Sequence, residues 1–190
     1  MLLEKIQQNA SLLAKHPAYR CGEDSLTYSQ LWNAASLLAA QLQDGAGAVA
    51  LIGTKQPMMA VGMLGSLLAG RPYLPLSSDQ PKERLQRILS QANPGTVIDC
   101  REAKAEQWLK REPATQNFLI PGDPSRDAYW LFTSGSSGSP KGVRISLAAL
   151  ENFVRWFCAL PAIRSRKKPG AALNQAQFSF DLSVADLWPA

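Results

Sequence analysis

Apolar residues recur along this chain at two alternating spacings, one typical of helices and the other of buried strands. Helices are predicted at about residues 1–14, 28–42, 57–69, 81–91 and 147–158, with a weaker one at 103–110. Strands are predicted at about residues 48–52, 73–76, 96–99, 117–120, 129–132, 143–145 and 171–174. Because helices alternate with strands, we expect an α/β fold whose parallel sheet is covered on both faces.

Several residues refine this pattern. Thr27 stands directly before the second predicted helix, where its hydroxyl can act as an N-cap. The helix at 57–69 is apolar nearly all round, so we expect it to be buried on most of its surface. Tyr73 and Pro75 are expected to shape the core rather than to contact a ligand. Core or interface positions are also expected for the tryptophans, Trp32, Trp108, Trp130, Trp156 and Trp188.

The composition indicates one soluble globular unit. The chain has 190 residues, of which 46% are hydrophobic and 18% charged, a length that suits one core or one large lobe. Charges at Glu4 and Lys5 interrupt the apolar start, which argues against a secretory signal. The most apolar span, 46–70, is broken by Lys55, Gln56 and Pro57, so we expect no membrane span and a cytoplasmic location.

Cysteine and histidine usage excludes several kinds of chemistry. The cysteines, Cys21, Cys100 and Cys158, are odd in number and widely spaced, which favours reduced structural thiols over a metal site. His16 is the only histidine, so a Ser-His-Asp triad or a histidine metal cluster is not expected. We therefore predict no protein-bound metal centre.

Positive charge is concentrated late in the chain. Residues 141–170 hold seven Lys or Arg against one Glu, within a net charge of +5 for the whole chain. No aromatic residue interleaves with the basic run at 164–168, so nucleic-acid binding is not expected. A solvated loop is the preferred interpretation, and docking of an acidic partner protein is the alternative.

The segment at 129–143 carries the clearest chemical pattern. An apolar run leads into a loop of hydroxyls and glycines that a lysine closes, a composition suited to holding a polyphosphate through backbone N–H groups, hydroxyls and a point charge. Lys141 follows Pro140 and precedes Gly142, so the loop is not a Walker P-loop. A flexible Ser/Gly connector is the alternative. The candidate phosphate-binding residues are Thr133, Ser134, Gly135, Ser136, Ser137, Gly138, Lys141 and Gly142.

The run at 133–143, Thr-Ser-Gly-Ser-Ser-Gly-Ser-Pro-Lys-Gly-Val, resembles the phosphate-loop signature of the adenylate-forming (AMP-binding) enzyme superfamily. That superfamily usually has Thr where this chain has Ser137. Further resemblances follow in the family's order at 26–31 (Leu-Thr-Tyr-Ser-Gln-Leu), 68–76 (Leu-Ala-Gly-Arg-Pro-Tyr-Leu-Pro-Leu) and 180–183 (Phe-Asp-Leu-Ser). Residues 178–186 are most similar to ligases that load D-alanine or another amino acid onto a carrier protein.

The resemblance implies a fold, a reaction and its participants. The fold would be a layered parallel-sheet lobe from the large N-terminal domain of an adenylate-forming enzyme. ATP, with Mg²⁺, and an amino acid or other carboxylic acid would give an acyl-adenylate, and the phosphopantetheine thiol of an acyl or peptidyl carrier protein would then take the acyl group. Asp181 would receive the ammonium group of the amino acid. Asp181 can also cap a helix running through Ser183 to Trp188, and both roles can hold at once.

The same resemblance leaves alternatives. The family's later adenine-, ribose- and magnesium-binding motifs and its catalytic lysine have no counterpart in residues 1–190, so we assign no catalytic residue. Residues 1–190 are expected to be a single α/β lobe, the N-terminal part of an AMP-binding domain without the remaining sheet, barrel and C-terminal domain, and to be inactive alone. The alternatives are an acyl- or aryl-CoA synthetase fragment and a non-catalytic nucleotide-binding lobe.

Overall fold

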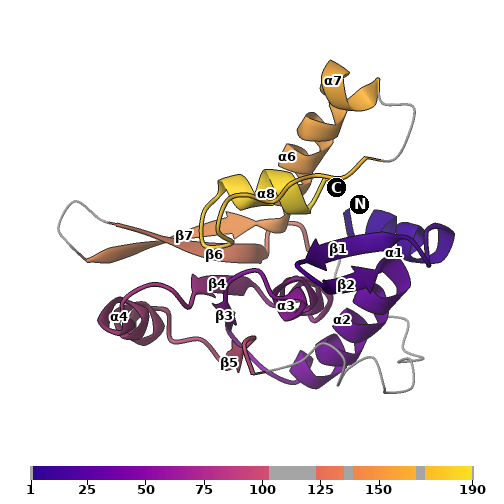
Figure 1. Cartoon of the computed structure of the whole chain (residues 1–190). Coiled ribbons are helices and arrows are strands. Elements are labelled where there is room, and N and C mark those ends of the chain that lie inside the picture. Colours follow the sequence, from indigo (N-terminus) through magenta and orange to yellow (C-terminus); the bar gives the residue numbers. More distant parts are fainter. Residues whose placement is uncertain (1, 103–122, 135–138, 166–169, 190) are drawn as a thin grey trace.

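The computed structural model describes residues 2–102, 123–134, 139–165 and 170–189. Its centre is a sheet with strand order β5-β3-β4-β6-β7. The strands are β3 (Val49–Gly53), β4 (Tyr73–Ser77), β5 (Thr96–Asp99), β6 (Asp127–Ser134) and β7 (Pro140–Ser146). Figure 1 shows helices on both sides of this sheet, which confirms the expected α/β fold.

The sheet is mixed rather than wholly parallel, which corrects the expectation from the sequence. Strands β5, β3, β4 and β6 run parallel, whereas β7 pairs antiparallel with β6. The cause is the connection between them. Only residues 135–139 separate the end of β6 from the start of β7, and so short a connection can join only antiparallel neighbours.

Side chains on the two faces of β3 pack into two separate hydrophobic cores. Val49 and Leu51 pack with α2 (Tyr28–Leu42) and α3 (Pro57–Leu68), whereas Ala50 and Ile52 pack with Ile88 of α4 (Lys82–Ala92). Every residue of α3 is buried, as its apolar surface predicts. An amphipathic α4 buries only Ile88. This alternation follows from the period-two side-chain geometry of a strand with a helix on each side.

The remaining helices cover the first core. Helix α1 (Leu2–Leu12) packs on α2, and α6 (Leu147–Ala159) buries Leu147 and Leu150 under the β6–β7 side of the sheet. Figure 1 shows α6 and the short α7 (Pro161–Arg164) projecting from the body, with α8 (Leu182–Leu187) lying over β6. Within the described ranges, no helix is long and apolar enough to cross a membrane.

Helix α2 begins where the sequence predicts. The Thr27 hydroxyl accepts a hydrogen bond from Gln30 N at 3.2 Å, and the Gln30 side chain accepts one from Thr27 N at 2.9 Å. This reciprocal capping box satisfies two backbone donors that a helix start leaves free.

The tryptophans divide between core and surface. Trp188 is buried, and its indole N–H donates to the Tyr73 hydroxyl at 2.9 Å, which confirms Tyr73 as a core residue. Trp32 and Trp130 pack against the cores. Trp156 is 58% exposed and is therefore not a core residue, and Trp108 lies outside the described residues.

Several sequence-based predictions of elements need correction or fall outside the structure. The hairpin of β1 (Pro17–Cys21) and β2 (Asp24–Thr27) was not predicted, although Gly22, with φ of 59°, marks its turn. Residues 171–174 form no strand. The helix predicted at 103–110 and the strand predicted at 117–120 lie outside the described residues.

Candidate functional site

A cleft of about 660 Å³ lies at the carboxyl ends of β4 and β6, the edge where ligands gather in parallel sheets. Its walls come from three parts of the chain: the β6–β7 hairpin, the segment that ends β4 and begins α4, and the turn before α8. Among the lining residues are Ser77, Asp79, Arg84, Thr133, Ser134 and Asp181. The fold therefore brings the start of the serine- and glycine-rich loop and the Phe-Asp-Leu-Ser turn to one cavity.

The hairpin supplies the first wall. Strand β6 is buried at Ala128, Tyr129 and Leu131 and leaves the interior at Thr133 and Ser134, whose side chains are exposed. Lys141 of β7 lies opposite Thr133 in the antiparallel register, which places the lysine beside the start of the loop. The other proposed phosphate-binding positions, residues 135–138, lie outside the described residues.

Gly142 is required for close packing within the hairpin. It lies opposite Phe132, and a Cβ built at Gly142 would stand 2.9 Å from the tip of the Phe132 ring. Phe132 in turn lines the cleft. The glycine therefore leaves room for the tip of the Phe132 ring, a different reason from the conformational freedom that a loop glycine provides.

The turn before α8 supplies the second wall. Asp181 is exposed and lines the cleft, and its carboxylate accepts a hydrogen bond from Leu182 N at 2.9 Å. Asp181 is also the N-cap residue of α8, so the capping role weighed from the sequence is confirmed. The Ser183 hydroxyl donates to the Phe180 carbonyl at 2.7 Å and braces the turn from within.

Asp181 and Tyr129 both line the cleft, and the charge of Asp181 acts on the Tyr129 hydroxyl. Burial, together with a smaller contribution from the negative charge of Asp181, raises the pKa of the Tyr129 hydroxyl to about 12. Tyr129 therefore stays a neutral phenol at physiological pH and leaves the carboxylate as the charged group on this wall.

The segment after β4 supplies the third wall, which sequence reasoning did not single out as a site. Ser77 Oγ accepts a hydrogen bond from Asp79 N at 3.3 Å, which turns the chain toward α4. The buried Gln80 Nε2 has no partner among the described residues, and Arg84 adds a positive charge to the same wall. Apolar spacing gave no signal for this wall, because polar residues of a connecting segment have no periodicity.

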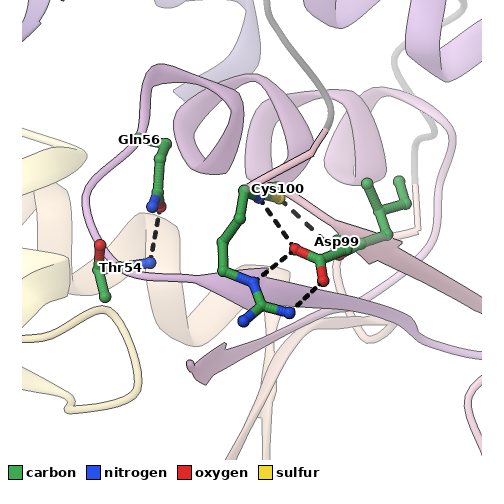
Figure 2. Close-up of polar contacts among 6 residues, drawn as sticks. Thr54, Gln56, Asp99 and Cys100 are labelled. Atoms are coloured by element: carbon green, nitrogen blue, oxygen red, sulfur yellow. Dashed lines mark hydrogen bonds and ion pairs between the residues drawn. The ribbon is translucent and has the colours of Figure 1, made fainter. Parts of the chain in front are cut away.

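The carboxyl ends of β3 and β5 make polar contacts within their own loops, as Figure 2 shows. After β3, the Gln56 side-chain oxygen accepts from Thr54 N at 2.7 Å. After β5, the Arg101 guanidinium donates to the Asp99 carboxylate at 2.9 Å and holds the pKa of that carboxyl below its usual value. These polar groups are satisfied internally, and neither Asp99 nor Arg101 lines the cleft.

The described ranges contain no group of three or more His, Cys, Asp or Glu side chains that could hold a metal ion. Cys21, Cys100 and Cys158 are all free thiols, of which Cys100 is buried and Cys158 exposed. The cleft thus offers hydroxyls, an amide, a guanidinium and two carboxylates, a donor set suited to an anionic ligand that also carries a cationic group.

Comparison with known proteins identifies the family that shares this arrangement. The profile of the AMP-binding enzyme family matches residues 6–190, and the chain belongs to that family. It is 33% identical over 197 aligned residues to the D-alanine--D-alanyl carrier protein ligases of Staphylococcus aureus strains JH9 and Newman. That alignment covers 99% of the chain and 40% of each relative, so the chain spans about two fifths of the length of these curated relatives.

Solved structures agree on the fold. The N-terminal subdomain of Klebsiella oxytoca NpsA matches all of the chain with a TM-score of 0.77 at 22% identity, over 50% of the NpsA chain. The same subdomain in complex with 3-hydroxyanthranilyl-AMSN matches 99% of the chain and 50% of its own, with a TM-score of 0.80 at 22% identity. The nonribosomal peptide synthetase FmoA3 matches all of the chain with a TM-score of 0.82 at 22% identity, over 21% of its own length.

Proposed function

We propose that this chain is part of an ATP-dependent ligase that adenylates an amino acid, of the D-alanine or glycine type, and transfers it to the thiol of a carrier protein. The observation that carries the proposal is the single cleft shared by Thr133 and Ser134, which begin the loop, and by Asp181 of the facing turn. The 33% identity to D-alanine--D-alanyl carrier protein ligases supports the same substrate class.

The first half-reaction joins the amino-acid carboxylate to the α-phosphate of ATP. A carboxylate oxygen forms a bond to the α-phosphorus, the bond from that phosphorus to the bridging oxygen breaks, and pyrophosphate leaves with the electron pair. In the second half-reaction a carrier thiolate attacks the acyl carbon and AMP leaves. Both steps need fixed positive charge and hydrogen-bond donors around the phosphates, placed before the reaction begins.

Each wall of the cleft would serve one part of the substrates. Thr133, Ser134 and Lys141, together with Gly135, Ser136, Ser137, Gly138 and Gly142, would hold the β- and γ-phosphates. Asp181 would receive the amino-acid ammonium group, because a carboxylate at the edge of an apolar wall is a strong partner for a cation. Its existing bond to Leu182 N uses one carboxylate oxygen and leaves the other available.

Magnesium would enter with the nucleotide. Magnesium in phosphate-transfer sites is commonly held by substrate phosphates plus one or two carboxylates, and the cleft offers Asp79 and Asp181 rather than a larger acidic cluster. When bound, the ion neutralises phosphate charge. The part of the site supplied by this chain would therefore orient the nucleotide rather than hold the metal by itself.

The remaining features of the whole protein are proposals of the same kind. Residues 1–190 would form one α/β lobe of the AMP-binding domain, acting in the cytoplasm with a phosphopantetheine-bearing carrier protein as partner. Since the curated relatives are more than twice as long as the aligned part, we expect the 190-residue chain alone to give no ATP–pyrophosphate exchange.

The test is ATP–pyrophosphate exchange by the full-length gene product, with D-alanine, glycine, L-amino acids and acids that lack an amino group. We expect exchange with one small amino acid. Asp181→Ala should raise the KM of that amino acid about ten- to a hundredfold and the KM of ATP less than threefold, because a hydrogen bond to a charged group contributes about 1.5–3 kcal/mol. Asp44→Asn is the control, because Asp44 is exposed and does not line the cleft.

A second candidate has its own support in the cleft. Tyr129, Phe132 and Phe180 line it, and aromatic walls suit an aryl acid. Exchange only with aryl or other plain acids, unaffected by Asp181→Ala, would favour an acyl- or aryl-CoA synthetase and overturn the amino-acid proposal. Absence of exchange with every acid would leave a nucleotide-binding lobe without ligase activity.

A further inference from the structure

Lys55 lies in the short loop between β3 and α3, and its side chain crosses to a segment more than a hundred residues later. Its ammonium group donates hydrogen bonds to the Asn174 side-chain oxygen and to the Ala176 carbonyl. The same ammonium lies 4.4 Å from the centre of the Phe178 ring, within the range of a cation–π contact. One ammonium group therefore makes three contacts with the segment at residues 174–178.

Asn174 extends these contacts to α8. Its amide nitrogen donates to the Ser183 carbonyl at 3.5 Å and to an Asp186 carboxylate oxygen at 3.4 Å. Burial lowers the pKa of Lys55, and the charge of Asp186 acts against that effect. Lysine, asparagine and aspartate thus form one polar cluster beneath the turn that carries Asp181.

The loop that holds Lys55 is itself fixed. The Tyr19 hydroxyl donates to the Lys55 carbonyl at 2.9 Å, and the Tyr19 ring lies 6.4 Å from that of Phe178. The residue before Lys55 is held by Gln56, whose side chain accepts from Thr54 N (Figure 2). A side chain anchored in this way can impose its position on a less regular segment.

Residues 174–180 are such a segment. They belong to no helix or strand, so side-chain contacts rather than backbone ladders fix their place. Only two residues separate Phe178 from Asp181, and Phe178 is 4% exposed while Asp181 is open to the cleft. The point at which Phe178 is held therefore decides where the Asp181 carboxylate lies.

We propose that Lys55 is a positioning residue for amino-acid recognition: by holding Asn174, Ala176 and Phe178, it fixes the turn that presents Asp181 to the substrate ammonium group. The proposal rests on the function proposed above for Asp181. Lys55 does not line the main cleft. It lines a smaller cavity of about 130 Å³, and Ser77, Asp79 and Gln177 line both the smaller cavity and the main cleft. Its effect is therefore indirect, through the turn.

The test compares variants of the full-length gene product. Lys55→Met keeps most of the side-chain volume and removes the charge and the donors, whereas Lys55→Arg keeps both. We expect Lys55→Met to raise the KM of the amino acid about tenfold or more with the KM of ATP changed less than twofold, because a small displacement of a binding group is costly. Lys55→Arg should recover most of the loss. Lys82→Met, at an exposed position on α4, is the matched control.

A second measurement uses the 190-residue chain and needs no activity. Hydrogen exchange of residues 174–183 should become faster in Lys55→Met, while exchange in β3 and β4 stays as in the parent chain. If β3 and β4 also lose protection, Asn174→Ala provides the same comparison, because it removes the acceptor from the opposite side of the contact.

The outcomes separate the two proposals. A parent enzyme that shows no amino-acid-dependent exchange would overturn the proposed function, whatever Lys55 does. An active parent whose amino-acid KM is unchanged in both Lys55→Met and Asn174→Ala would overturn the positioning role alone. Equal rises in the KM values of amino acid and ATP would also overturn it, since a general loss of structure affects both substrates.

Discussion

Arg71 shows how one buried side chain joins two parts of this fold. Its guanidinium, 5% exposed, donates to the carbonyls of Gly47 at 2.9 Å, Ala46 at 2.8 Å and Leu42 at 3.2 Å. These carbonyls belong to the end of α2 and to the connection between α2 and β3. That connection has no regular helix or strand hydrogen bonds of its own. Arg71 thus closes the α2–β3 connection from the start of β4.

Replacement of Arg71 by methionine should destabilise the chain. Three backbone carbonyls would lose their hydrogen bonds from a charged donor, so we expect the free energy of unfolding to fall by about 2–4 kcal/mol. Urea unfolding followed by circular dichroism measures this loss. Arg101→Met, whose guanidinium lies at the surface, is the control and should leave the midpoint unchanged. Equal midpoints for the two variants would contradict the structural role of Arg71.

The free cysteines should differ in reactivity because they differ in burial. Burial raises the pKa of the Cys100 thiol to about 12, so at pH 8 it is almost wholly protonated and poorly nucleophilic. Cys158 is exposed on α6. We expect iodoacetamide at pH 8 to label Cys158 within minutes and Cys100 only in denaturant, as measured by mass spectrometry of peptides. Rapid labelling of Cys100 in the native chain would show that its site opens readily.

At the scale of elements, sequence periodicity predicted the regular parts well. The helices α1, α2, α3, α4 and α6 and the strands β3, β4, β5 and β6 lie where apolar spacing placed them, because each buries a face of fixed period. The β1–β2 hairpin was missed because its strands are only five and four residues long, too short for a periodic pattern to stand out. The strand predicted at 171–174 failed because Asn174 is held by Lys55 and α8 rather than by a neighbouring strand.

The direction of β7 could not be predicted from the spacing of apolar residues either. Apolar spacing identifies a strand but not its partner, and the antiparallel pairing of β6 with β7 depends on the length of the connection. As for the site, the motif residues Thr133, Ser134 and Asp181 were found from the sequence and do line one cleft. Lys55 and Gln80 were not, because their significance comes from contacts between distant segments.

The β6–β7 hairpin gives a prediction at this scale. In Gly142→Ala the new methyl group would press on the Phe132 ring, which must then shift and so change the wall of the cleft that it lines. We expect a loss of about 1–3 kcal/mol in unfolding free energy and a several-fold lower rate of pyrophosphate exchange by the full-length gene product. Adding Phe132→Leu should relieve the clash and recover part of the stability. Additive losses in the double variant would show that the two residues do not interact.

At the scale of the whole molecule, the described surface leaves large apolar side chains open to water near the candidate site. Leu173 is 82% exposed, Leu182 69% and Phe180 61%, and the contact between Asn174 and Ser183 brings their segments together. Large apolar side chains exposed on neighbouring segments favour association. We therefore expect the 190-residue chain to self-associate in solution.

Light scattering over a range of concentrations tests this expectation. The parent chain should show a mass that rises with concentration, and the double variant Leu173→Gln, Leu182→Gln should shift the association to about tenfold higher concentration or more, because each substitution replaces apolar side-chain surface with a polar amide. Leu12→Gln is the matched control, since Leu12 is 79% exposed but lies on α1, away from this surface. A parent chain that stays monomeric at every concentration would refute the expectation, and an equal effect of Leu12→Gln would show that association does not depend on the surface beside the turn.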